Sequence, residues 1–401
     1  MHVFIRHGDR TALAELLGYQ HTGYSCNFTD WLIKQDYKDS FAHSFSTFMD
    51  EMSQHITVDK SFRTHAFYPN KPSCRDSALT ARGVLQHIHL GRHFRESYIV
   101  ANNHLNISDS FNTRVFVKTT KRERTFQSAN AFLYGFLPHS KSSYPKLHKA
   151  SNMMFCESSP SLTCNCKQAN GLYQRRKRLA NAIATSSSTY ADLAAAISKA
   201  LDVDVEELPH LSSLADTLSP SYCHGMEPRC SRKDPNNCVY GRLVSKLWNE
   251  MAKINSLVQA NLSSGSNKFA SISAYPLLLE LAQRISKLPH SPSRERFFLY
   301  SGHDLTLEPL LEALGVPSRR RPPYASRLVI EAYQSQIGND VMVRILYNGN
   351  DVTESVSFCE NDLKDGMCPS DVFYEFVSEK MLQRHGHATY NDACSVSLTD
   401  D

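Results

Sequence analysis

Short apolar runs that stop abruptly at charged or small residues recur along this chain. They are rich in β-branched and aromatic side chains, which is typical of strands buried in a sheet. The runs with this pattern are residues 3–5, 115–120, 297–300, 327–333 and 341–347. We expect the last two, which are close in sequence, to be neighbouring strands.

Apolar residues at helical spacing follow two of these runs and fill the middle of the chain. The helical faces are Phe126, Ala129, Leu133 and Phe136, then Tyr190, Leu193, Ile197 and Leu201, and then Leu307, Leu310, Leu311 and Leu314. Strand signals are lost between about 141 and 290, where long helices are expected near 240–260 and 270–287. A last helix is expected over 370–384. The pattern therefore predicts an α/β domain of residues 1–140 and 291–401, interrupted by an α-helical insertion over 141–290.

Two of the predicted strands are each followed by a histidine that stands beside charged residues. The first is followed by Arg6-His7-Gly8-Asp9-Arg10, and the strand over 297–300 by Ser301-Gly302-His303-Asp304. A lone histidine beside arginine is usually surface charge, but strand ends are where open α/β sheets hold their ligands. Imidazole is a competent nucleophile toward phosphorus, and guanidinium forks match tetrahedral oxyanions. We expect Gly8 to let a phosphate approach the backbone, and we interpret Asp9 as structural.

The two motifs together resemble the histidine acid phosphatase family. Arg124-Thr125, after the strand over 115–120, resembles its third landmark, and Leu79-Thr80, Gly83, Gln86-His87 and Leu90-Gly91 resemble its first helix. The resemblance implies a phosphoglycerate-mutase-like fold, with a mixed, mainly parallel sheet, flanking helices and a helical cap over the mouth of the active site.

The resemblance also implies a mechanism. His7 would attack phosphorus and form a phosphohistidine, while Arg6, Arg10, Arg124 and His303 would bind the phosphoryl oxygens. Asp304 would protonate the leaving oxygen and then draw a proton from the attacking water. Because these cationic groups supply the positive charge, we expect no metal and no cofactor.

Stretches outside the motifs resemble a branch of the family that removes phosphate from xylose in the linker of proteoglycans. They are residues 68–74, 133–138, 344–349 with 351–353, and 390–394. A phosphorylated xylose of such a linker is therefore the expected substrate; a broad-specificity lysosomal or secreted acid phosphatase remains an alternative. A non-catalytic glycan-binding protein is disfavoured, because the six catalytic and phosphate-binding residues are all present. One departure is Ala12, which stands where the family carries a proline that stiffens the loop after the nucleophile.

Charge and hydropathy exclude some classes of protein. A net charge of +4 over 401 residues is too small to argue for nucleic acid, and no run of eighteen apolar residues encodes a membrane span. The basic runs at 175–178 and 319–321 are interpreted as solvated faces rather than docking sites for an acidic glycan.

The 11 cysteines favour disulfides over zinc, because no spacing follows the paired C-x₂-C form. Loop closure suggests Cys26 with Cys74 and Cys359 with Cys368, and the family resemblance suggests Cys394 with Cys164 or Cys166. One thiol should remain free or pair between chains. Sequons at Asn27, Asn106 and Asn261 also indicate the secretory pathway. No signal or anchor precedes the first strand, whereas the resemblance implies an N-terminal anchor and a Golgi address.

Overall fold

A computed structural model describes residues 1–13, 23–35, 39–101, 105, 111–137, 144–157, 162, 164–290, 294–316, 321–335 and 340–395. Its centre is a sheet in which the strands lie in the order β3-β2-β4-β1-β5-β6-β7, with β8 paired to β6. The strands are β1 His2–Arg6, β2 Val115–Thr119, β3 Leu147–Lys149, β4 Phe297–Gly302, β5 Arg327–Gln334, β6 Val341–Tyr347, β7 Asn350–Asp351 and β8 Cys368–Pro369. The pairs β3–β2, β2–β4 and β4–β1 are parallel, whereas β5 runs antiparallel to both β1 and β6. The sheet is therefore mixed, with its central pairs parallel, as expected.

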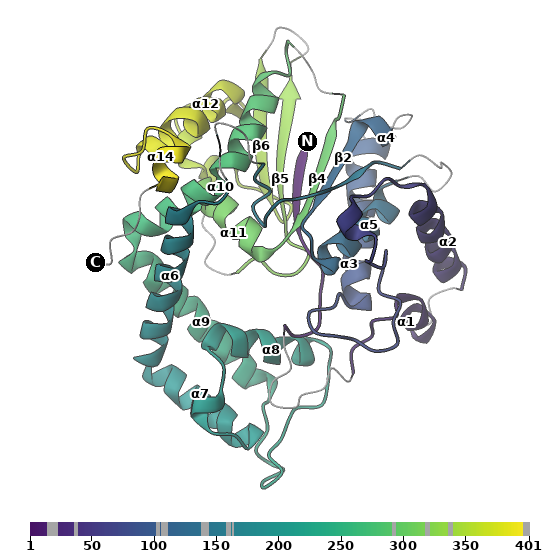
Figure 1. Cartoon of the computed structure of the whole chain (residues 1–401), viewed down its shortest axis with the longest axis vertical. Coiled ribbons are helices and arrows are strands. Elements are labelled where there is room, and N and C mark those ends of the chain that lie inside the picture. The colour runs from purple at the N-terminus through teal and green to yellow at the C-terminus, as the bar shows by residue number, and fades with distance from the viewer. Residues whose placement is uncertain are drawn as a thin grey trace.

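Helices cover both faces of the sheet (Figure 1). One face carries α1 Phe28–Lys34, α2 Asp39–His55, α3 Ala81–Arg95 and α5 Glu123–Phe136. The other carries α10 Ser263–Ser286, α11 Asp304–Ala313, α12 Ser370–Glu375, α13 Met381–Gln383 and α14 Tyr390–Ser395. A short α4, Phe111–Arg114, leads into β2. Since successive side chains of a strand point to opposite faces, Phe4 packs in one core and Val3 and Ile5 in the other.

The α-helices between β3 and α10 lie mostly below the sheet in Figure 1, and the first of them runs down from beside α10. They are α6 Lys167–Thr185, α7 Ser188–Leu201, α8 Leu211–Cys223 and α9 Gly241–Asn261. A hydrophobic cluster of their own, from Ala184 to Val258, holds α7, α8 and α9 together. We call α6–α9 the cap.

Two details differ from the sequence pattern. β3 lies inside the stretch where no strand was expected, and it pairs with β2. Three residues are too few to show a periodicity, so the prediction of a strand-free segment is wrong there. α10, also within that stretch, packs with α11 in the core on the sheet, and it also contacts α6.

Candidate active site

Three adjacent parallel strands, β2, β4 and β1, end at the same edge of the sheet and place the candidate catalytic residues there. Arg6 of β1 is in register with Gly302 of β4, so His7 and His303 are the first residues beyond the two strand ends. The His7 amide donates to the Gly302 carbonyl (3.0 Å), and the Thr120 amide, just past β2, donates to the Ser301 carbonyl (3.2 Å). The strand ends thus place the two histidine motifs side by side.

His7 is buried and held in one tautomer. Its Nδ1 lies 2.8 Å from the Gly8 carbonyl oxygen, which can only accept, so Nδ1 carries the proton and Nε2 has a free lone pair. Burial, reinforced by Arg124 and Arg6, lowers the pKa of His7 well below 6.5. The His303 ring lies 5.4 Å away, centroid to centroid, nearly perpendicular to it. A neutral imidazole with an available nitrogen is the form in which histidine acts as a nucleophile.

Three arginines surround His7. Arg6 donates from Nη1 to the Pro322 carbonyl (2.5 Å), and its guanidinium lies 4.4 Å from the centre of the Tyr324 ring. Arg124, at the start of α5, donates to Ser77 Oγ (3.3 Å). The buried Nε atoms of Arg6, Arg10 and Arg124 have no hydrogen-bond partner among the described residues. A phosphoryl group would supply the acceptors that these donors lack.

Asp304 is the first residue of α11, where its carboxylate is buried between two arginines. Oδ1 lies 3.9 Å from Arg6 Nε, and Oδ2 pairs with Arg321. Burial alone would raise the pKa of Asp304, but Arg6 and Arg321 outweigh it and hold that pKa well below its usual range. Asp304 is therefore a carboxylate near neutral pH.

His303 is fixed by the neighbouring strand. Its Nε2 lies 2.9 Å from Thr120 Oγ1. Burial, reinforced by the charge of Arg124, lowers the pKa of His303 to about 3. His303 is therefore neutral near neutral pH.

Gly8 serves helix packing rather than phosphate approach. A Cβ on Gly8 would lie 2.4 Å from the Gly83 carbonyl oxygen in α3, and one on Gly83 would lie 2.3 Å from the Asp9 carbonyl oxygen. The space beside Gly8 is thus filled by the helix. The expectation that this glycine opens room for a phosphate is wrong, because its missing side chain faces α3.

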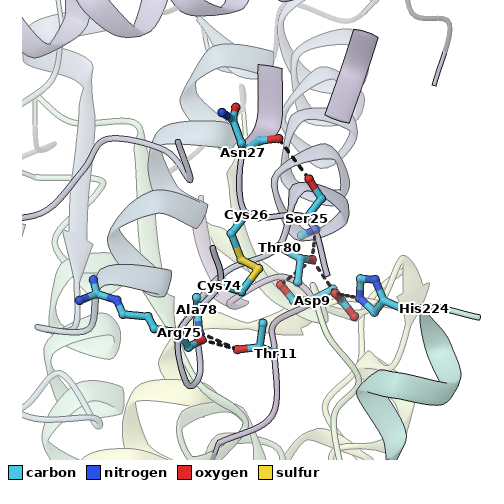
Figure 2. The surroundings of a disulfide bond; sticks show 11 residues. Asp9, Thr11, Ser25, Cys26, Asn27, Cys74, Arg75, Ala78, Thr80 and His224 are labelled. Carbon is cyan, nitrogen blue, oxygen red and sulfur yellow. Dashed lines mark hydrogen bonds and ion pairs between the residues drawn. A yellow bond between two sulfur atoms is a disulfide. The ribbon is translucent and has the colours of Figure 1, made fainter. Parts of the chain in front are cut away.

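The cap contributes two side chains to the site. Asp216 of α8 accepts two hydrogen bonds from Arg10, at 2.6 and 3.2 Å. His224, which caps the end of α8, lies with Nε2 2.5 Å from Asp9 Oδ1, and Thr80 donates to the same oxygen at 2.6 Å (Figure 2). The contacts of Asp9 are thus with a threonine and a cap histidine, which is compatible with the structural role expected for it.

The loop after the nucleophile is fastened by a disulfide and by Thr11. Cys26 and Cys74 are bonded, with 5.3 Å between their Cα atoms, as predicted. Thr11 Oγ1 donates to the Arg75 carbonyl (2.7 Å) and accepts from the Ala78 amide (3.0 Å) (Figure 2). These contacts tie the segment around Ala12 to the 75–78 loop, although the family proline is absent.

Four further disulfides are present among the described residues. Cys166–Cys394 and Cys359–Cys368 match the expected pairings, whereas Cys156–Cys164 and Cys230–Cys238 were not foreseen. Cys223 is free and exposed, which agrees with the odd cysteine count. Of the sequons, Asn261 is exposed and Asn27 partly buried, whereas Asn106 lies outside the described residues. The disulfides fit a protein of the secretory pathway or its lumen.

Several site residues carried no recognisable signal in the sequence: Thr120, Asp216, His224, Arg321 and Tyr324. The reading of the basic runs as solvated faces is wrong for two of their members. Arg321 pairs with Asp304, and Arg176 of α6 pairs with Glu308 (2.8 Å) and Glu312 (3.2 Å) of α11. Arg319 and Arg320 lie outside the described residues. Only the contact partners, which are distant in sequence, distinguish these arginines from surface charge.

The described residues contain neither a cluster of side chains that could hold a metal ion nor a helix that could span a membrane. Across the described ranges, no three His, Cys, Asp or Glu side chains are grouped so as to hold a metal ion. In the same ranges, no helix has the length and apolarity needed to cross a bilayer.

Comparison with known proteins identifies the class. Residues 1–348 match the histidine phosphatase superfamily, branch 2, and the chain belongs to that family. It is 29% identical over 405 residues to 2-phosphoxylose phosphatase 1 of Homo sapiens, covering 98% of this chain and 80% of the relative. It is 25% identical over 314 residues to lysophosphatidic acid phosphatase type 6 of Bos taurus, covering 75% of this chain and 65% of that protein.

A solved structure supports the fold. The phytase from Citrobacter braakii superimposes with a TM-score of 0.56 at 16% identity, over 94% of this chain and 96% of the phytase. Family membership and the phosphatase relatives make this protein a phosphoric monoester hydrolase of the histidine acid phosphatase type.

Proposed function

We propose that this phosphatase removes the 2-phosphate from xylose in the glycosaminoglycan–protein linker of proteoglycans, through a phosphohistidine on His7. The observation that carries the chemistry is the neutral His7, which has Nε2 directed away from its Nδ1 hydrogen bond and stands among three arginines whose Nε–H groups have no hydrogen-bond partner in the described part of the chain. The sugar substrate is supported by 29% identity to 2-phosphoxylose phosphatase 1 across nearly the whole chain. The enzyme would act in the Golgi lumen, and its disulfides are compatible with a lumenal compartment.

In the first half-reaction His7 Nε2 attacks phosphorus in line, and the bond to the sugar oxygen breaks. Arg6, Arg10 and Arg124 hold the equatorial oxygens, with a further hydrogen bond from His303. Asp304 gives its proton to the departing sugar oxygen. For this it must first be protonated, and a phosphate dianion beside Arg6 favours that by offsetting the charge that keeps Asp304 ionised.

In the second half-reaction water replaces His7 on phosphorus. Asp304, now a carboxylate, accepts a proton from that water as the new P–O bond forms and the P–N bond breaks. His7 returns to its neutral form, and inorganic phosphate leaves. No other group is needed to balance the protons.

The deciding experiment compares substrates. Phosphate release from a linker oligosaccharide containing 2-phosphoxylose is measured beside release from phosphotyrosine and glycerol phosphate, with the His7→Ala variant as blank. We expect kcat/KM to be highest for the linker by at least about tenfold, the scale of one well-made substrate contact. Similar kcat/KM values for all three would instead indicate a broad-specificity acid phosphatase.

A further inference from the structure

A row of alternating charges crosses the site from the cap to Asp304. Asp216 of α8 binds Arg10 through both carboxylate oxygens, and its Oδ1 also lies 3.9 Å from Nη1 of Arg321. Arg321 pairs through Nε with Oδ2 of Asp304. Arg6 faces the other oxygen of that carboxylate, at 3.9 Å. Each oxygen of Asp304 thus has its own guanidinium.

The side chains of this row of charges are largely buried, which restricts their orientations. The side chains of Asp216 and Asp304 are each 6% exposed, and that of Arg321 is 23% exposed. Charge-assisted hydrogen bonds between such groups restrict side-chain orientation, and removing one partner leaves the other charge without compensation. The direction in which Asp304 points therefore depends on Arg321.

Arg321 also differs from the arginines that surround His7. The Nε atoms of Arg6, Arg10 and Arg124 have no hydrogen-bond partner among the described residues, whereas that of Arg321 is taken by Asp304. Its Nη1 faces Asp216. The contacts of Arg321 in this structure are with carboxylates of the protein, so it is not equipped as a fourth phosphate binder.

We propose that Arg321 is a positioning residue for Asp304 and is itself held by Asp216, so that the cap sets the orientation of the general acid. This inference rests on the proposed role of Asp304. A cap contact that orients the acid affects protonation of the leaving group without affecting capture of the phosphoryl group.

A pH effect follows from the charges that face Asp304. They are Arg6 from β1, Arg321 from the segment before β5, Arg124 from α5, His303 before it in the chain, and Glu308 one turn later in α11. Loss of the positive charge of Arg321 raises the pKa of Asp304. The acid then stays protonated to higher pH, so the alkaline limb of the rate profile moves to higher pH for a leaving group that needs the proton.

The test uses Arg321→Met, the charge-retaining Arg321→Lys, and Arg284→Met as matched control. Arg284 forms an i,i+4 ion pair with Glu280 (2.8 Å) that is more than a quarter exposed on both sides, so its loss should be close to neutral. Single-turnover rates of intermediate formation, together with KM, are measured against pH with glycerol phosphate, a poor leaving group, and with p-nitrophenyl phosphate, whose leaving group departs without protonation. Single-turnover rates are used because Asp304 also acts in hydrolysis of the intermediate, a step that both substrates share.

For Arg321→Met we expect the single-turnover rate on glycerol phosphate to fall about tenfold, a part of the about 10²–10⁴ that general acid catalysis contributes. The alkaline limb should move to higher pH, KM should change less than about twofold, and p-nitrophenyl phosphate should be nearly unaffected. Arg321→Lys, which keeps the positive charge, should return the alkaline limb of the rate profile to the wild-type pH. Asp216→Asn should reproduce the loss on glycerol phosphate and also raise KM for both substrates, because Arg10 loses its partner.

Equal losses of the single-turnover rate on both substrates, or a rise in KM with that rate unchanged, would overturn the inference. Asp304→Asn in the same assay separates it from the proposed function. If Asp304→Asn shows no dependence on the leaving group, the proposed acid role fails. If Asp304→Asn shows that dependence and Arg321→Met does not, only the positioning role fails.

Discussion

The phosphate pocket and the cap side of the active site are built in different ways. The pocket is made by Arg6 at the end of β1, by residues shortly beyond the ends of β1, β2 and β4, and by Arg124 in the first turn of α5, so a rigid sheet fixes its geometry. The cap side is made by Asp216 and His224, which come from a helix with a hydrophobic core of its own. Its connection to the catalytic residues consists of hydrogen bonds and ion pairs.

This difference suggests that the two regions serve different parts of the reaction. Residues held by three parallel strands have fixed positions. Such residues suit phosphoryl transfer, in which positive groups must lie at defined positions around the negative phosphoryl oxygens. A cap joined through polar contacts suits recognition of the part of the substrate that leaves. Substitutions in the pocket should therefore impair all substrates, whereas substitutions on the leaving-group side should depend on which substrate is used.

The largest effect that separates the two regions is expected for Asp304→Asn. With glycerol phosphate the rate should fall by about 10²–10⁴, because the leaving alkoxide no longer receives a proton. With p-nitrophenyl phosphate the formation of the intermediate should suffer much less. Single-turnover rates on both substrates measure the two losses, and equal losses would return Asp304 to a structural role.

A somewhat smaller and uniform effect is expected for Arg124→Leu. Loss of one oxyanion donor commonly costs about 10²–10³ in rate, and here the leaving group should not matter. Arg122→Leu is the control, since Arg122 is exposed and only two residues away. A loss confined to poor leaving groups would place Arg124 outside the phosphate pocket.

On the cap side, His224→Ala should affect stability more than chemistry. Asp9 keeps its bond from Thr80 but loses the one from His224, and a hydrogen bond to a charged group contributes about 1.5–3 kcal/mol. The free energy of unfolding in denaturant should fall by about that amount, with kcat on p-nitrophenyl phosphate changing less than about threefold. A 10²-fold loss of rate would instead place His224 in the chemistry.

The smallest effect expected is the response of His7 to acid. Burial and the neighbouring guanidiniums both disfavour the imidazolium, so the pKa of His7 lies well below 6.5 and the ring stays neutral as the pH falls through that value. Nitrogen-15 NMR of the histidine side chains in the substrate-free enzyme measures this directly. It should also show the proton on Nδ1, the atom beside the Gly8 carbonyl. Protonation of His7 near pH 6.5 would contradict the electrostatics of the pocket.

The two regions also differ in how far sequence alone predicts them. His7 and His303-Asp304 follow apolar runs long enough to be recognised as strands, and parallel strands bring their ends together. Arg10 and Asp216, in contrast, are 206 positions apart, and nothing near Asp216 marks it as the partner of an arginine. Arg321 was interpreted as solvated because a basic run has the same composition whether or not a buried carboxylate faces it.

Trapping the intermediate tests the central claim most directly. Wild-type enzyme is mixed briefly with substrate carrying labelled phosphate, quenched in alkaline detergent, and digested to locate the label. A base-stable, acid-labile label on His7 is the predicted result, with no label and no phosphate release in His7→Ala. Label on a serine or an aspartate, or normal phosphate release by His7→Ala, would contradict a phosphohistidine mechanism at the end of β1.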